Sequence, residues 1–234
     1  KKLNNLESNS MGFKVIRITG LFFLVIIAIF WLQQPNLNTI GENHKNYSSL
    51  IAFADENAEV TIAEMTLGSE EAEVEIVEYA SYTCPHCATF HTEIYPQLKK
   101  SYIETGKVRF IYREVYFDKY SLWASVIARC AGPSKFFGLT DLIYQSQKKW
   151  SRAGDDNAIM SELKKLAKVA GLTDDKIKSC LTNKEKVRAL VEWYKTNASN
   201  DEIKSTPSFV INGEKFSNMG YDEFSSIIES KISQ

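Results

Sequence analysis

Residues 78–91, EYASYTCPHCATFH, contain the motif Cys84-Pro85-His86-Cys87 and separate a strand-like pattern from a helical one. The run just before it, residues 74–77, is rich in β-branched side chains and predicts a short strand. After the motif, apolar residues recur at helical spacing over residues 88–98. The two cysteines are therefore expected where a strand leads into the first turn of a helix.

This position has chemical consequences for both thiols. The first turn of a helix carries N–H groups without main-chain partners and the positive end of the helix dipole, and both favour a thiolate over a thiol. Pro85 suits this turn because its φ is already helical. We therefore predict that Cys84 is a nucleophile of lowered pKa and that Cys87, one turn later, closes a disulfide with it. His86 can donate a hydrogen bond or a positive charge to the Cys84 thiolate, which makes the disulfide more oxidising.

Two other kinds of site share this pattern. A C-x-x-C pair is half of many zinc sites, and His91 adds a third candidate ligand. A structural zinc site needs four ligands, however, and no fourth lies nearby in the sequence, so no metal is predicted. A purely structural disulfide between Cys84 and Cys87 would close a very short loop and constrain little of the unfolded chain. The strand-to-helix context favours redox chemistry.

Composition sets the broad class of the protein. The chain has 234 residues, of which 44% are hydrophobic and 24% charged, as in an ordinary globular protein with room for one domain of generous size. The net charge of -1 gives no indication of a nucleic-acid partner. Four cysteines are too few for a disulfide-rich scaffold, but two pairs are possible.

The N-terminal segment, residues 1–35, contains an uncharged apolar run at residues 18–32 with Lys14 and Arg17 before it. The run fits a signal peptide, and it is slightly shorter than the roughly 20 residues that span a membrane. We favour an uncleaved signal-anchor at the bacterial inner membrane, with the first residues in the cytoplasm and the rest exported to the periplasm. Cleavage, which would release a soluble periplasmic protein, remains the alternative. Met11 is a sensible natural start, which leaves open whether residues 1–10 belong to the natural protein.

Beyond a polar linker at residues 36–60, the pattern predicts an α/β domain with a helical insertion. Residues 61–120 contain expected strands and the C-x-x-C motif, with one helix running from it to about residue 102 and kinked at Pro96. Residues 121–200 have helical periodicity throughout. Residues 201–234 complete the α/β part with a strand, an Asn-Gly hairpin turn, a second strand and a closing helix.

Composition and spacing alone do not decide whether the two remaining cysteines are paired or whether one X–Pro bond is cis. Cys130 and Cys180 lie in the helical block, and in an exported protein we favour a structural disulfide over two buried thiols. Thr206-Pro207 directly precedes the strand at 208–211. Only about 5–6% of X–Pro bonds are cis in folded proteins, so the dipeptide alone favours trans.

Four motifs in order resemble the DsbA-type thiol:disulfide oxidoreductases of the thioredoxin superfamily, particularly their α-proteobacterial branch. They are YASYTCPHC at 79–87, GKVRF at 106–110, ARCAG at 128–132 and STPSFVING at 205–213. The resemblance covers the chain from about residue 74 to residue 232. It implies a thioredoxin fold with an inserted helical domain, which is the architecture expected above.

The resemblance also implies roles for particular residues. Cys84 matches the exposed nucleophile, Cys87 the buried partner and His86 the tuning residue of the C-P-H-C motif. Pro207 matches a cis-proline facing the disulfide, against the base rate, and Thr206 matches the residue whose main chain pairs with an extended substrate peptide. Glu78 matches an acidic residue beneath the site that assists proton transfer. Cys130 and Cys180 match a second disulfide.

The sequence and the resemblance together predict a periplasmic enzyme that donates the Cys84–Cys87 disulfide to reduced exported polypeptides and needs no other cofactor. Its expected partner for reoxidation is a DsbB-like, quinone-linked membrane protein, and it is expected to be a monomer. Threonine before the cis-proline also occurs in related isomerases, so an isomerase or reductase is an alternative. A second alternative is an anchored peptide- or metal-binding module whose cysteines never turn over.

Overall fold

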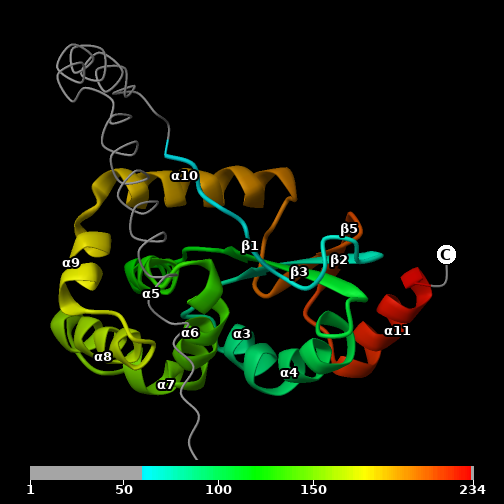
Figure 1. The fold of residues 1–234 in the computed structure, drawn as a ribbon, viewed down its shortest axis with the longest axis horizontal. Helices are drawn as coiled ribbons and strands as arrows, with labels where there is room; N and C mark the ends of the chain where they lie inside the picture. The colour runs from blue at the N-terminus through cyan, green and yellow to red at the C-terminus, as the bar shows by residue number, and fades with distance from the viewer. Residues whose placement is uncertain (1–59, 233–234) are drawn as a thin grey trace, which may run out of the picture. The chain divides into compact units, whose positions relative to one another are not determined.

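A five-stranded sheet is the centre of the computed structural model, which describes residues 60–232 (Figure 1). The strand order is β1-β3-β2-β4-β5. The strands are β1 (Met65–Leu67), β2 (Val74–Ala80), β3 (Val108–Glu114), β4 (Ser208–Ile211) and β5 (Glu214–Ser217). The predicted tail, the apolar run at 18–32 and nearly all of the linker lie outside the described residues. No helix within residues 60–232 is long and apolar enough to cross a membrane.

The middle of the sheet is formed by β2, which pairs in parallel with β3 and antiparallel with β4. Ile76 lies opposite Phe110 on one side and Ile211 on the other. A strand with neighbours on both edges and helices on both faces must be apolar almost throughout, and all of β2 except Glu75 is buried. The register with β4 brings the end of β2, which leads into the C-x-x-C motif, beside the start of β4.

The predicted hairpin turn at Asn212-Gly213 is confirmed. Both residues have positive φ, 47° and 82°, which the tight turn between β4 and β5 requires and which asparagine and glycine tolerate best. The Asn212 amide oxygen accepts a hydrogen bond from the Glu75 main-chain N–H at 2.7 Å, and its amide nitrogen donates to the Glu73 carbonyl at 3.1 Å. The turn is thereby fixed to the start of β2.

The helix after the motif differs from the single kinked helix that the sequence predicts. It consists of α3 (Pro85–Thr89), the π-helical turn η2 (Phe90–Ile94), α4 (Tyr95–Leu98) and a second π-helical turn, η3 (Lys99–Ile103). Pro96 falls in the first turn of α4, directly after η2. A proline cannot donate a main-chain hydrogen bond, so a change of register is least costly next to it. The π-helical turns were not expected from the sequence.

The helical insertion lies between β3 and β4 in the chain. Its helices are α5 (Lys119–Cys130), α6 (Pro133–Gln145), α7 (Gln147–Trp150), α8 (Asp156–Val169), α9 (Asp174–Thr182) and α10 (Lys184–Asn200). The breaks near residues 132, 151–156 and 171 fall at Gly132, at a polar run and at Gly171. Further breaks occur at Ser146 and at Asn183, whose side chain caps α10 by accepting from the Lys186 N–H at 2.9 Å.

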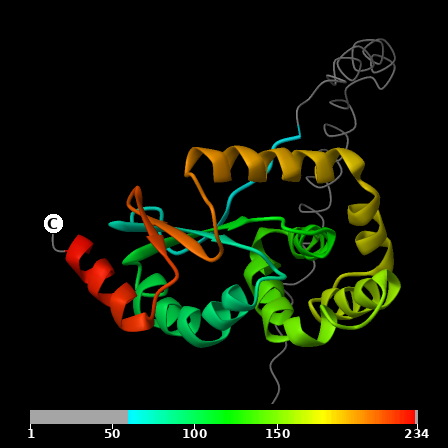
Figure 2. The same ribbon diagram turned by 180° about the vertical axis from the view of Figure 1, so that it is seen from behind.

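Two apolar layers cover the sheet, one on each face (Figures 1 and 2). The helices from α3 to η3 and the closing helix α11 (Tyr221–Ile232) cover one face, where Phe90, Phe209 and Phe224 meet with ring centroids 4.7–5.6 Å apart. α10 lies along the other face, where Tyr194 and Ala198 pack on a smaller cluster. The larger core continues from the sheet into the helical insertion.

A buried ion pair and a disulfide connect the insertion. Arg129 of α5 donates two hydrogen bonds to Glu114 of β3, at 2.6 and 2.7 Å, and both side chains are almost completely buried. Removing one partner of such a pair is strongly destabilising, because the remaining buried charge then has no partner. Cys130 of α5 is joined to Cys180 of α9 across a sequence separation of 50. Closing a loop of this length is worth roughly 4 kcal/mol in the chain-entropy model.

Candidate active site

The two thiols of the motif lie at the start of α3 in different surroundings. Cys84 is the residue that precedes the helix, in an extended conformation, and Pro85 occupies the first helical turn. Cys84 is partly exposed, whereas the Cys87 side chain is fully buried. In this structure the two sulfurs are not joined. The strand-to-helix position expected from the sequence is confirmed. It leaves Cys84 accessible to solvent and places Cys87 in the core.

The environment of Cys84 favours its thiolate. Its pKa is lowered to about 5, chiefly because the Cys87 thiol donates a hydrogen bond to it. Thr206 and the main-chain N–H groups of His86 and Cys87 lower the pKa further, against the opposing effect of partial burial. The His86 side chain is exposed, so its main-chain N–H is the group through which the structure shows it acting on Cys84.

The environment of Cys87 has the opposite effect. Burial raises the pKa of this thiol well above its usual value, and the neighbouring Cys84 and Glu78 raise it further. At neutral pH the reduced pair therefore consists of a Cys84 thiolate and a Cys87 thiol. A low-pKa thiolate is a good leaving group, and its stability favours the reduced form of the pair, which makes the disulfide a better oxidant.

The Thr206–Pro207 peptide bond is cis, as the resemblance implied and against the base rate. The bond leads directly into β4, where Ser208 pairs with Tyr79 near the end of β2. Cys84 Sγ lies 3.4 Å from the Thr206 carbonyl oxygen. The tertiary structure thus brings together residues that are more than a hundred positions apart in the chain.

Glu78 lies in β2 beneath the motif and is completely buried. Burial is the main reason why its pKa is raised, and His91 opposes that shift. His91 Nε2 lies 2.9 Å from Glu78 Oε2. The histidine that the sequence offered as a third zinc ligand is therefore occupied with a carboxylate. Within residues 60–232, no group of three or more His, Cys, Asp or Glu side chains is placed to hold a metal ion.

Gln147 is a residue of the site that the sequence did not indicate. Its side chain is buried at the start of α7, and its amide nitrogen donates to the Tyr82 carbonyl at 2.9 Å and to the Cys84 carbonyl at 2.8 Å. These two bonds fix the main chain of the loop that carries the nucleophile. Nothing in the sequence marks this glutamine, because its partners are 63 and 65 residues away.

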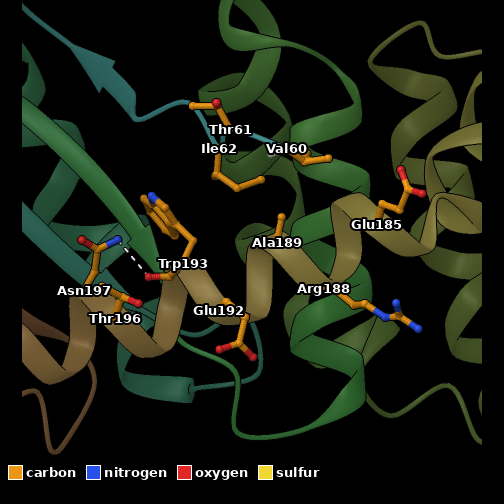
Figure 3. A pocket seen from close by; sticks show the side chains of 10 residues that line it. All are labelled: Val60, Thr61, Ile62, Glu185, Arg188, Ala189, Glu192, Trp193, Thr196 and Asn197. Atoms are coloured by element: carbon orange, nitrogen blue, oxygen red, sulfur yellow. Dashed lines mark hydrogen bonds between the residues drawn. The ribbon is translucent and has the colours of Figure 1, made fainter. Parts of the chain in front are cut away.

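A pocket of the described part lies away from the two thiols. It has a volume of about 670 Å³ and is lined by residues 60–62 and by one side of α10, including Trp193 (Figure 3). None of the residues named above as part of the site lines it, and its lining has no thiol or imidazole. The groups capable of redox chemistry are therefore Cys84 and Cys87, outside this pocket.

Replacing Gln147 by leucine tests its role as the support of the Cys84 loop. In Gln147→Leu two buried carbonyls lose their donor, which is expected to cost about 1–3 kcal/mol in the free energy of unfolding of the reduced protein. The measurement is urea denaturation. The matched control is Gln145→Leu, because Gln145 is exposed two residues earlier and its change is expected to stay within about 0.5 kcal/mol. Equal midpoints for both variants would contradict the role.

The pH dependence of alkylation tests the lowered pKa of Cys84. A pKa of about 5 means that the thiolate is already fully formed near pH 7. The rate of reaction of Cys84 with iodoacetamide should rise as the pH increases through about 5 and be level between about pH 7 and 9, where an ordinary thiol would still gain reactivity. A rate that continues to rise to pH 9 would show that the thiolate is not stabilised.

Three comparisons with known proteins agree with this geometry. The family model described as Thioredoxin matches residues 60–230. A Rickettsia bellii protein, provisionally named a protein-disulfide oxidoreductase, is 33% identical over 203 residues, which are 86% of this chain and 72% of that protein. Four further Rickettsia proteins are 32–33% identical, and this chain spans only 61–62% of their length.

Solved structures share the fold. Wolbachia pipientis alpha-DsbA1 superimposes with a TM-score of 0.68 at 24% identity, covering 74% of this chain and 93% of that one. Bacillus subtilis BdbD does so with a TM-score of 0.63 at 26% identity, covering 73% and 94%. The predicted thioredoxin fold with a helical insertion is thus confirmed. The chain belongs to the thioredoxin superfamily and, within it, to the DsbA-type thiol:disulfide oxidoreductases.

Proposed function

We propose that this protein donates the Cys84–Cys87 disulfide to reduced polypeptides exported from the cytoplasm. The observation that carries the proposal is that the two thiols have opposite pKa shifts: the pKa of the partly exposed Cys84 is about 5, and that of the buried Cys87 is raised. An active-site pair whose reduced form is stabilised in this way gives up its disulfide readily. A pair serving as a reductant would need the reduced form to be less stable.

The reaction proceeds by two exchanges. A substrate thiolate attacks Cys84 Sγ, the Cys84–Cys87 bond breaks, and its electron pair leaves on Cys87, which takes up a proton. The second substrate thiolate then attacks the substrate sulfur of the mixed disulfide, and Cys84 leaves as a thiolate. The substrate has lost two electrons and the protein has gained them. Glu78, buried beside Cys87 with a raised pKa, is the group proposed to supply the proton that Cys87 takes up.

Substrate binding is proposed at the cis-proline. The main chain at Thr206 and Pro207 lies against Cys84 and just before the first β4 residue, so an extended peptide that paired with it would run past the reactive sulfur. Main-chain pairing of this kind is independent of the peptide's sequence, which suits an enzyme that acts on many substrates. The Thr206 carbonyl oxygen, 3.4 Å from Cys84 Sγ, receives no hydrogen bond from Cys84 once that thiol is ionised, and it would then be free to accept from a peptide N–H.

The proposed setting is the periplasm. The Cys130–Cys180 disulfide supports it, because such bonds persist outside the reducing cytoplasm. In this setting the reduced pair has to be reoxidised, and we propose a DsbB-like, quinone-linked membrane protein as the oxidant. The proposal includes a monomer held at the inner membrane by residues 18–32, with a cleaved, soluble form as the alternative.

The reduction potential of the Cys84–Cys87 pair tests the proposal and separates it from a reductase. Equilibration of the full chain with glutathione buffers, followed by alkylation and mass analysis, is expected to give a value near the oxidising extreme of about -120 mV. A value near about -270 mV, as in thioredoxin, would mean that the protein reduces its targets. The non-catalytic alternative predicts that a Cys84→Ser/Cys87→Ser double variant complements a deletion strain as well as the wild type does.

Single serine variants test the order of the two exchanges. Cys84→Ser removes the attacked sulfur and is expected to abolish substrate oxidation, since the remaining thiol is buried and its pKa is raised. Cys87→Ser keeps the reactive Cys84 and removes the neighbouring thiol that can attack Cys84 Sγ in a stalled mixed disulfide, so mixed disulfides should accumulate. Non-reducing electrophoresis of cells expressing each variant shows this. Ordinary turnover in Cys84→Ser would refute the assignment.

A further inference from the structure

The Cys87 thiol has to gain and lose a proton although it is buried. Each reduction of the pair places one proton on Cys87, and each reoxidation removes it. The Cys87 side chain is fully buried, and so is its charged neighbour Glu78. A proton on Glu78 cannot be exchanged directly with solvent, so the enzyme needs a group that connects this carboxyl to the surface.

His91 is the group in contact with Glu78. His91 belongs to the π-helical turn η2, and its Nε2 is 2.9 Å from Glu78 Oε2. The side chains of His91 and Glu78 are both completely buried. The other ring nitrogen, Nδ1, lies 4.0 Å from Asp141 Oδ1 of α6. An imidazole can accept a proton on one nitrogen and release one from the other, so this orientation connects two carboxyl groups through one ring.

Asp141 brings the route to the surface. Its side chain is 32% exposed, and it lines a pocket of about 350 Å³ together with His91, Tyr95 and Lys99. His91 Nδ1, Asp141 Oδ1 and the Tyr95 hydroxyl are buried polar atoms with no hydrogen-bond partner in the described part of the chain. The 4.0 Å separation is too long for a direct hydrogen bond and short enough for one bridging water or a small side-chain movement.

The surroundings hold the ring in this orientation. Tyr144 of α6 stacks on the imidazole ring, with ring centroids 4.2 Å apart and planes inclined by 13°. The rings of Tyr95 in α4 and Tyr112 in β3 also pack on it, with centroid distances of 5.0 and 5.7 Å.

The charged groups along this proton route are Glu78 and Asp141, with Lys99, Lys100 and Glu104 at the pocket. Lys99 acts on Asp141 and is paired with Glu104. Burial raises the pKa of the Glu78 and Asp141 carboxyl groups. The shift brings both groups closer to neutral pH, where a carboxyl group can both take up and release a proton.

We propose that His91, together with Asp141, carries the Cys87 proton between Glu78 and the pocket formed by η2, α4, η3 and α6. This deepens the proposed function, since it rests on Cys84–Cys87 turning over. During reoxidation, Cys87 loses its proton to the Glu78 carboxylate, His91 takes that proton at Nε2 and releases one from Nδ1 toward Asp141, and the proton leaves through the pocket. During reduction the same steps run in reverse. His91 acts here through Glu78 and touches neither sulfur.

The test separates the two steps of reoxidation of the full chain by glutathione disulfide. In the first step the Cys84 thiolate attacks, forming Cys84–glutathione and releasing one glutathione thiolate. In the second, Cys87 loses its proton and attacks Cys84 Sγ, which expels the other glutathione. Acid quenching and mass analysis report both rates. Only the second step needs the relay.

His91→Gln retains a group that can bond to Glu78 but cannot pass a proton through. It should leave the first step unchanged and slow the second by about tenfold or more, in line with the contribution of general acid–base groups. Added imidazole, a soluble proton carrier, should restore part of the rate. Asp141→Asn should also slow the second step, most strongly at low buffer concentration. Glu104→Gln is the matched control, because Glu104 lines the same pocket without contacting His91 in the described structure.

The outcomes are distinct. Second-step rates within about twofold of wild type in both His91→Gln and Asp141→Asn, from pH 5 to 8, would overturn the relay. A slow second step in His91→Gln alone would keep His91 and remove Asp141 from the route. A loss of the first step as well would mean that His91→Gln is misfolded, and Asp141→Asn then decides. Failure of the proposed function looks different, because the wild type itself would then have a strongly reducing potential or not react.

Discussion

Two sulfur atoms one helical turn apart have opposite electrostatic surroundings, and the rest of the structure serves to maintain that difference. Cys84 stands before the first turn of α3, where main-chain N–H groups, Thr206 and the Cys87 thiol stabilise its negative charge. Cys87 enters the core, where a charge has no solvation and Glu78 disfavours a second anion. A helix that begins at the surface and continues inward produces such a difference, because its first turn offers N–H groups and its next turn lies in the core.

The sheet positions the other parts of the site. Because β4 runs antiparallel to β2 with Ser208 opposite Tyr79, the residues that precede β4 lie beside the residues that follow β2. The cis-proline and the C-x-x-C motif meet there. Glu78 belongs to the same end of β2, one position before Tyr79, which places a buried carboxyl beneath the thiols. A shift of the β2–β4 register by one residue would turn Glu78 to the opposite face of the sheet.

The helical insertion contributes directly to the site. Gln147 at the start of α7 bonds the carbonyl groups on either side of the Cys84 loop, and Tyr144 and Asp141 of α6 surround His91. The insertion is in turn attached to the sheet by the Arg129–Glu114 pair and closed by the Cys130–Cys180 disulfide. In this protein the environment of the active-site loop therefore depends on helices that a minimal thioredoxin sheet would lack.

The sequence by itself determined what depends on neighbouring residues. Local patterns of apolar residues, glycine and proline indicate the strand before the motif, the helix start at Cys84-Pro85, the Asn212-Gly213 turn and the helical block. Tertiary structure alone decided what depends on distant pairs. The proximity of Pro207 to Cys84 depends on the pairing of β4 with β2, and local patterns do not indicate it. The role of Gln147 depends on the position of α7 beside the Cys84 loop. A local pattern records the preferences of adjacent residues, whereas contacts between residues 63 or more positions apart exist only once the chain has folded.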